Sequence, residues 1–81
     1  MRLKALFDML DAEPFRPFVI ELLNGRSVPV SHPENVSFIP NRSKVLLIVV
    51  GVPEQEDYHL FYPESLCSFQ RKRLKNGARG A

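Results

Sequence analysis

The chain has 81 residues, which suffices for one small domain, because chains usually divide into domains only at about 100–200 residues each. Its 44% apolar residues can build a hydrophobic core and argue against wholesale disorder. The net charge of +2 divides unevenly: residues 1–70 carry six basic and nine acidic side chains, a net −3, whereas residues 71–81 carry five basic and no acidic ones. We therefore expect a folded, mildly acidic domain over residues 1–70 and a basic, disordered tail over residues 71–81.

Cysteine usage and hydropathy exclude further classes of protein. The single cysteine, Cys67, rules out an internal disulfide and a zinc site built from cysteines alone. The longest apolar run, residues 45–50, is far shorter than the ~18–20 residues of a membrane span. Acidic residues at positions 8, 11 and 13 interrupt any apolar signal peptide. We expect a soluble, cytoplasmic protein with no membrane partner.

The first predicted element is a short amphipathic helix over residues 2–12. Apolar side chains recur there at i, i+3, i+4 and i+7, namely Leu3, Leu6, Phe7 and Leu10. Pro14 disfavours helical geometry at Glu13 and should end the helix. A helix of about three turns is marginal alone in water, so it needs a partner surface.

A β-hairpin is predicted next, because the apolar period changes to two and Asn24-Gly25 follows. A three-residue loop, residues 23–25, would pair Phe18 with Val30, Ile20 with Val28 and Leu22 with Arg26. That register gathers the apolar side chains on one face, and register normally follows the buried face. Gly25 should then adopt the left-handed conformation.

Four further strands are predicted, at residues 36–40, 45–50, 58–62 and 66–69. The second of these is a run of six aliphatic residues, which is typical of a strand buried on both faces. The fold class is therefore mainly β: a short N-terminal helix followed by a bent five- to six-stranded antiparallel sheet. We expect the sheet to curl into a small barrel with the helix at one opening.

Candidate catalytic residues are few. Catalysis needs a nucleophile, a base within hydrogen-bond reach and a group that orients the base. His32-Pro33-Glu34 could place an imidazole beside a carboxylate if both lined a concave pocket; the alternative is a His-Pro turn. His59 is interpreted as a half-exposed sheet residue, and Cys67 as a buried small hydrophobe. The chain has no glycine-rich phosphate loop. We expect no enzyme, no metal site and no cofactor.

Several motifs resemble a group of short, largely uncharacterised bacterial proteins, best represented in planctomycete-like genomes. The resemblance spans residues 13–69 and rests on the order of four segments: Pro14-Phe15-Arg16-Pro17-Phe18, Asn24-Gly25-Arg26, His32-Pro33-Glu34 and His59-Leu60-Phe61. It implies a shared fold unit.

The order of elements also resembles the Sm-like fold, in which a short helix precedes a strongly bent sheet. Leu22-Leu23-Asn24-Gly25 looks like the end of the first Sm-like strand. Where bacterial Sm-like RNA chaperones carry Tyr-Lys-His, this chain has Tyr62-Pro63-Glu64. The resemblance implies a small Sm-like or SH3-like barrel, assembly into rings and possible RNA binding.

Two binding hypotheses follow for such a barrel. In the first, RNA or DNA is held by cations of the tail and of three turns: Arg71, Lys72, Arg73, Lys75, Arg26, Arg42 and Lys44. Because the body is net negative, such binding should depend on the tail and fall steeply with salt.

The second hypothesis is a protein-interaction module. Phe15, Arg16 and Phe18 could form a stacking platform for a protein partner; alternatively, both aromatic rings pack the helix onto the sheet while Arg16 points to solvent. The short apolar strand at residues 66–69, with Leu66 and Phe69, could pair with another copy through its free edge. We therefore expect a homo-oligomer.

Overall fold

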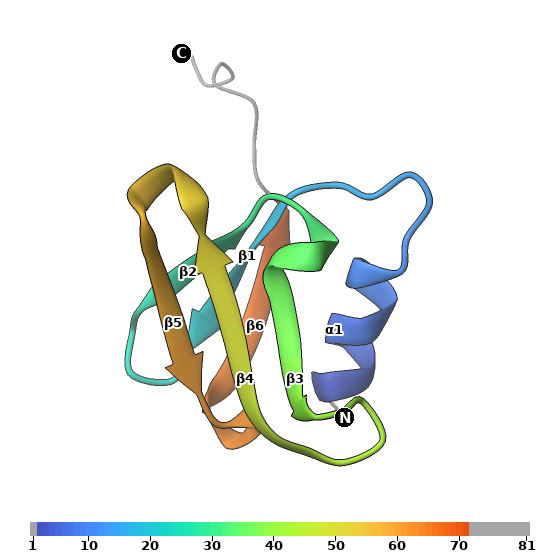
Figure 1. Cartoon of the computed structure of the whole chain (residues 1–81), viewed down its shortest axis with the longest axis vertical. Helices are drawn as coiled ribbons and strands as arrows, with labels where there is room; N and C mark the ends of the chain where they lie inside the picture. The colour runs from blue at the N-terminus through green and yellow to red at the C-terminus, as the bar shows by residue number, and fades with distance from the viewer. Residues whose placement is uncertain (1, 72–81) are drawn as a thin grey trace.

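The computed structural model describes residues 2–71, which form one helix followed by six strands (Figure 1). The elements are α1 (Arg2–Leu10), β1 (Phe18–Leu22), β2 (Ser27–Val30), β3 (Val36–Pro40), β4 (Val45–Val52), β5 (Asp57–Phe61) and β6 (Leu66–Arg71). Three single-turn 3-10 helices join the later strands: η1 (Pro33–Asn35), η2 (Pro53–Gln55) and η3 (Pro63–Ser65). Each begins with proline, whose fixed φ suits the first helical position.

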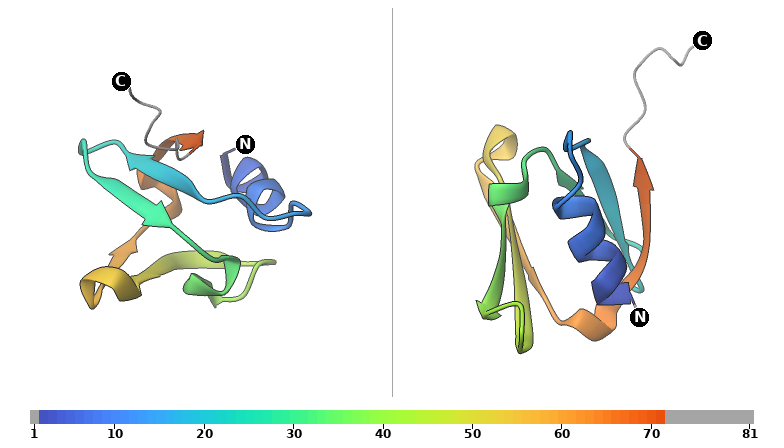
Figure 2. Two further views of the ribbon diagram at one scale, coloured as in Figure 1. Left: turned by 90° about the horizontal axis from the view of Figure 1, so that it is seen from above. Right: turned by 90° about the vertical axis from the view of Figure 1, so that its right-hand side faces the viewer.

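The strands form two antiparallel sheets with the orders β2-β1-β6 and β3-β4-β5. The two sheets face each other, and α1 lies along the open side between them (Figure 2). The mainly β class is therefore confirmed, but the described strands do not close into a barrel. The chain leaves the first sheet after Val30 and enters the second at Val36, and η1 lies between them.

The hairpin prediction is confirmed in register and in loop conformation. Phe18 pairs with Val30 and Ile20 with Val28. The backbone N–H of Leu22 donates to the carbonyl of Arg26 at 2.9 Å, which closes the three-residue loop. Gly25 has φ +89°, a conformation that side-chain-bearing residues rarely adopt.

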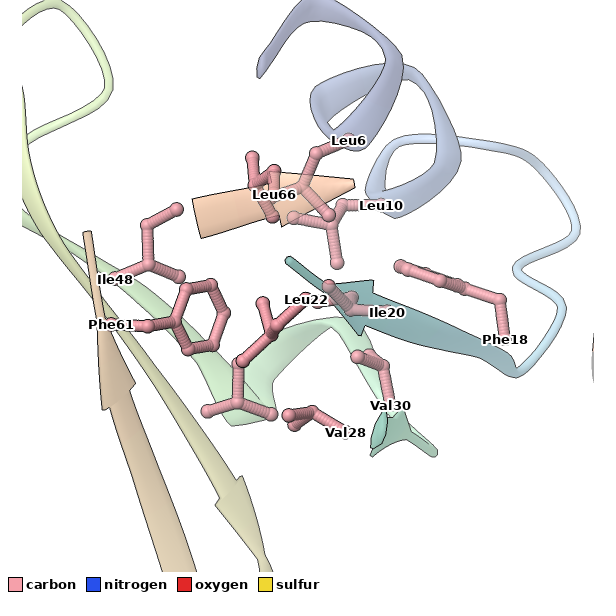
Figure 3. Packing of buried hydrophobic residues seen from close by; sticks show 11 residues of the cluster. Leu6, Leu10, Phe18, Ile20, Leu22, Val28, Val30, Ile48, Phe61 and Leu66 are labelled. Carbon is pink, nitrogen blue, oxygen red and sulfur yellow. The ribbon is translucent and has the colours of Figure 1, made fainter. Parts of the chain in front are cut away.

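The hydrophobic core lies between the two sheets and α1 (Figure 3). Its buried members are Leu6, Leu10, Phe18, Ile20, Leu22, Val28, Val30, Ile48, Val50, Phe61 and Leu66. The helix contributes Leu6 and Leu10, because its apolar stripe faces this interior. α1 ends at Leu10, two residues earlier than predicted.

Strand β4 is the main departure from expectation, because it is buried on one face only. Ile48, Val50 and Val52 are buried, whereas the alternate residues Leu47 and Val49 are only half-buried. No part of residues 2–71 covers the opposite face of this sheet, so the prediction of burial on both faces is wrong.

Candidate interaction surface

The predicted nucleic-acid cations do not converge in the described part of the chain. Arg71, the last residue of β6, pairs with Phe18 at the start of β1, whereas Arg26 follows the end of β1. The length of that strand, about 14 Å, therefore separates the two cations. Lys44 is exposed in the β3–β4 turn on the second sheet. Lys72, Arg73 and Lys75 lie outside the described residues.

Arg42 already has protein partners. Its two guanidinium nitrogens donate to the carboxylate oxygens of Asp11 at 2.8 and 2.9 Å. The guanidinium also stacks over the rings of Phe7 and Phe38, at 5.0 and 5.7 Å from their centroids. These contacts attach α1 to β3, so a structural role accounts for this arginine.

The Arg42–Asp11 pair shifts the pKa of both groups. The hydrogen bonds from Arg42 hold the pKa of the Asp11 carboxyl below its ordinary value; desolvation opposes this shift, and the charge of Arg42 adds to it. The same hydrogen bonds raise the pKa of Arg42, so both groups remain charged at neutral pH.

The predicted partner-binding residues are mostly part of the core. Phe18 and Leu66 have no exposed surface, and Phe15 and Phe69 pack against the same core. A partner could not reach the side chain of Phe18 or Leu66 without unfolding the domain, so side-chain contacts by these two residues are ruled out. β6 is an edge strand of its sheet, so pairing of its backbone with another copy stays a prediction. Arg16 is exposed. The arrangement matches the alternative in which the two rings pack on the core while the arginine faces solvent.

The remaining reactive residues are dispersed. His32 is exposed before η1, and His59 is half-buried on β5, as predicted for a sheet residue. Within residues 2–71, no three His, Cys, Asp or Glu side chains lie together as metal ligands would. A shallow hollow of about 260 Å³ is lined by Arg2, Leu3, Val45, Pro63 and Glu64, none of which is a nucleophile or a histidine.

Cys67 is exposed, contrary to the prediction of burial. The register between β1 and β6 shifts here: Glu21 pairs with Ser68 and Leu22 with Leu66. Cys67 is therefore the extra residue of a bulge, a position with no partner on the neighbouring strand. Alternation along the sequence could not reveal this displacement.

Of the six large apolar side chains that are strongly exposed within residues 2–71, five lie on the solvent side of the sheet β3-β4-β5. We call the apolar part of this side the outer face and define it as Ile39, Leu46, Leu47, Val49, Tyr58, Leu60 and Tyr62; Ser37 and Gly51 lie on the same side of the sheet. Across the strands, Ile39 pairs with Leu47 and Val49 with Leu60, which places their side chains about 5 Å apart. Tyr62 follows β5 in extended conformation and continues the alternation of Tyr58 and Leu60. Leu46 is the extra residue of the bulge between β3 and β4.

Five members of the outer face are strongly exposed. Their exposed fractions are 46% for Ile39, 58% for Leu46, 63% for Tyr58, 55% for Leu60 and 64% for Tyr62. Isolated exposed apolar residues are normal, but a contiguous patch commonly marks an interaction site. The sequence signals for it are the aliphatic run of β4, which is predicted above to be buried on both faces, and the alternation of Tyr58, Leu60 and Tyr62, which is predicted above only as a strand.

Comparisons with known proteins identify no family, relative or similar structure for this chain. A scan against protein-family models, a search of curated proteins and a search of solved structures each found no match for this chain. The one helix of the described residues has nine residues, which is too short to cross a membrane. The geometry of the outer face therefore carries the functional argument.

Proposed function

We propose that the protein is a non-enzymatic binding and assembly module that associates with a second copy of itself through the outer face. The observation that carries this proposal is the contiguous, uncharged apolar face of a three-stranded sheet that no part of residues 2–71 covers. Sheets bury such faces by packing against another sheet about 10 Å away. A second copy offers a matching flat sheet.

The area of the outer face suits a weak dimer. At roughly 200 Å² for a fully exposed large side chain, its five exposed residues present on the order of 500 Å² of apolar surface. Two copies would bury about 1,000 Å² in total, the lower end for specific complexes. We therefore expect association that depends on protein concentration.

The chemistry of the outer face disfavours a nucleic-acid partner. Its seven residues include no cation, whereas nucleic-acid affinity depends on neutralising phosphates with lysine and arginine. Its tyrosines could stack on bases, but single-strand binding surfaces combine such rings with a positive groove. The exposed cations Arg26 and Arg71 lie on the other sheet.

The proposal is tested with Leu60→Glu and a matched control. Leu60 lies on the outer face, whereas Leu23 is similarly exposed, at 64%, in the β1–β2 turn. Light scattering coupled to size exclusion, from about 10 μM to about 1 mM, should show wild type passing from monomer to dimer. Leu60→Glu should remain monomeric, because a buried unpaired carboxylate is costly, and Leu23→Glu should behave as wild type.

Circular dichroism spectra of both variants serve as the control that each one folds. A wild-type protein that stays monomeric at the highest concentration would refute self-association. Equal association of Leu60→Glu and Leu23→Glu would refute the outer face as its site. Co-purifying nucleic acid, detected by the absorbance ratio and unaffected by Leu60→Glu, would assign binding to another surface.

A further inference from the structure

The two ends of the outer face carry opposite charge. At one end, the β4–β5 turn and the neighbouring η1 bring together three exposed acidic residues, Glu34, Glu56 and Asp57. Asn35 of η1 lies beside Gly51, which confirms that η1 shares this end with the β4–β5 turn. Figure 1 shows the β4–β5 turn and the β3–β4 turn at opposite ends of the sheet.

The other end of the outer face is weakly basic. The β3–β4 turn carries Arg42 and Lys44, and the hollow beside it is lined by Arg2 and Glu64. The charge of Arg42 is balanced by Asp11. Lys44, which directly precedes β4, is therefore the main cation at this end of the outer face. Counting Asp11 with its partner Arg42, the five residues Arg2, Asp11, Arg42, Lys44 and Glu64 sum to +1, whereas Glu34, Glu56 and Asp57 at the acidic end sum to −3.

The two ends are far enough apart to act separately. β4 has eight residues and spans about 24 Å. The Debye length is about 8 Å at physiological ionic strength, so each end interacts mainly with whatever lies directly opposite it. The outer face is thus an apolar centre with an acidic and a basic flank.

We infer that this polarity selects one of the two ways in which two copies can stack, an inference that rests on the proposed function. A two-fold axis in the interface parallel to the strands would place acidic end on acidic end. A two-fold axis in the interface perpendicular to the strands places each acidic end opposite a basic end. Complementary charges favour the second arrangement, in which Lys44 of each copy faces the β4–β5 turn of the other.

The resulting dimer is closed. The same surface is used on both copies, and no second outer face remains to extend it, so the assembly stops at two copies. Charge complementarity at both flanks also makes the association sensitive to salt.

The test is a charge-reversal cycle with Lys44→Glu, Glu56→Lys and the double variant. Lys44→Glu should raise the dimer dissociation constant roughly three- to tenfold at about 20 mM NaCl, and less at about 500 mM NaCl. Glu56→Lys should weaken the wild-type dimer but strengthen the Lys44→Glu dimer, because its new cation then faces a glutamate. Sedimentation velocity measures all four constants.

Arg26→Glu is the control for net charge, since it makes the same change in the β1–β2 turn of the other sheet. It should leave the dissociation constant within about twofold of wild type. Tighter dimerisation by Glu56→Lys in the wild-type background would overturn the inference, because it would indicate that like ends meet. If the dimer dissociation constants of all the charge variants were equal and independent of salt, and Leu60→Glu were still monomeric, the inference about charge would be overturned. The proposed function would remain intact. A monomeric wild type would refute the proposed function, and the inference with it.

Discussion

At the scale of single residues, Arg42 makes a contact that links distant parts of the chain. It joins α1 to β3 by two hydrogen bonds to Asp11 and by stacking on Phe7 and Phe38. The rings of Phe7 and Phe38 also meet edge to face at 5.0 Å. The arginine that resembled a phosphate ligand in the sequence therefore helps to hold the helix in place.

This pair predicts a pH dependence of stability. Because the native pKa of Asp11 is lowered, the pair stabilises the fold fully above the ordinary aspartate pKa of about 3.9 and loses this contribution as the pH falls through the native pKa. Asp11→Asn should lower the urea midpoint at about pH 7, and the deficit should shrink towards about pH 2.

Asp8→Asn is the control for this pair, because the ion pair that Asp8 forms with Lys4, one turn away on α1, is exposed and local. It should change the urea midpoint less than Asp11→Asn does at neutral pH. A deficit of Asp11→Asn that is independent of pH would contradict the assigned role of its carboxylate.

At the scale of elements, two glycines differ in what the backbone requires of them. Gly25 adopts φ +89° in the β1–β2 turn, whereas Gly51 lies within β4 without a positive φ. A side chain at Gly51 would meet only the carbonyl oxygen of Asn35, at an ordinary 3.8 Å. The turn therefore needs its glycine, and the strand does not.

Alanine substitution should separate these two roles. Gly25→Ala should cost about 1–2 kcal/mol of unfolding free energy, because alanine is strained at positive φ. Gly51→Ala should be neutral or stabilise by up to about 1 kcal/mol, because glycine weakens a strand interior. Urea unfolding in the Leu60→Glu background keeps association out of the measurement. A loss at Gly51 as large as that at Gly25 would contradict this account.

At the scale of the whole molecule, self-association should couple to stability. A dimer that binds only the folded state raises its apparent stability by mass action. The thermal midpoint of wild type should therefore rise with protein concentration, while that of Leu60→Glu should stay constant. A wild-type midpoint that does not change with concentration would indicate that the outer face remains exposed in solution.

Much of the local structure could be predicted from the sequence. The period of two and Asn24-Gly25 defined the β1–β2 register, and the 3.6-residue period of α1 identified its buried side. These features depend on residues close together in the chain, where backbone geometry and side-chain alternation act directly.

Only the tertiary structure decided how the elements divide and which surfaces they leave open. The split into two sheets, the bulge that exposes Cys67 and the contact of Arg42 with Asp11 all depend on residues distant in sequence. The aliphatic run of β4 shows the same limit. Its composition specifies a strand, but whether its second face is covered depends on what else packs there. In this protein no part of residues 2–71 does, and that apolar face is where we place its function.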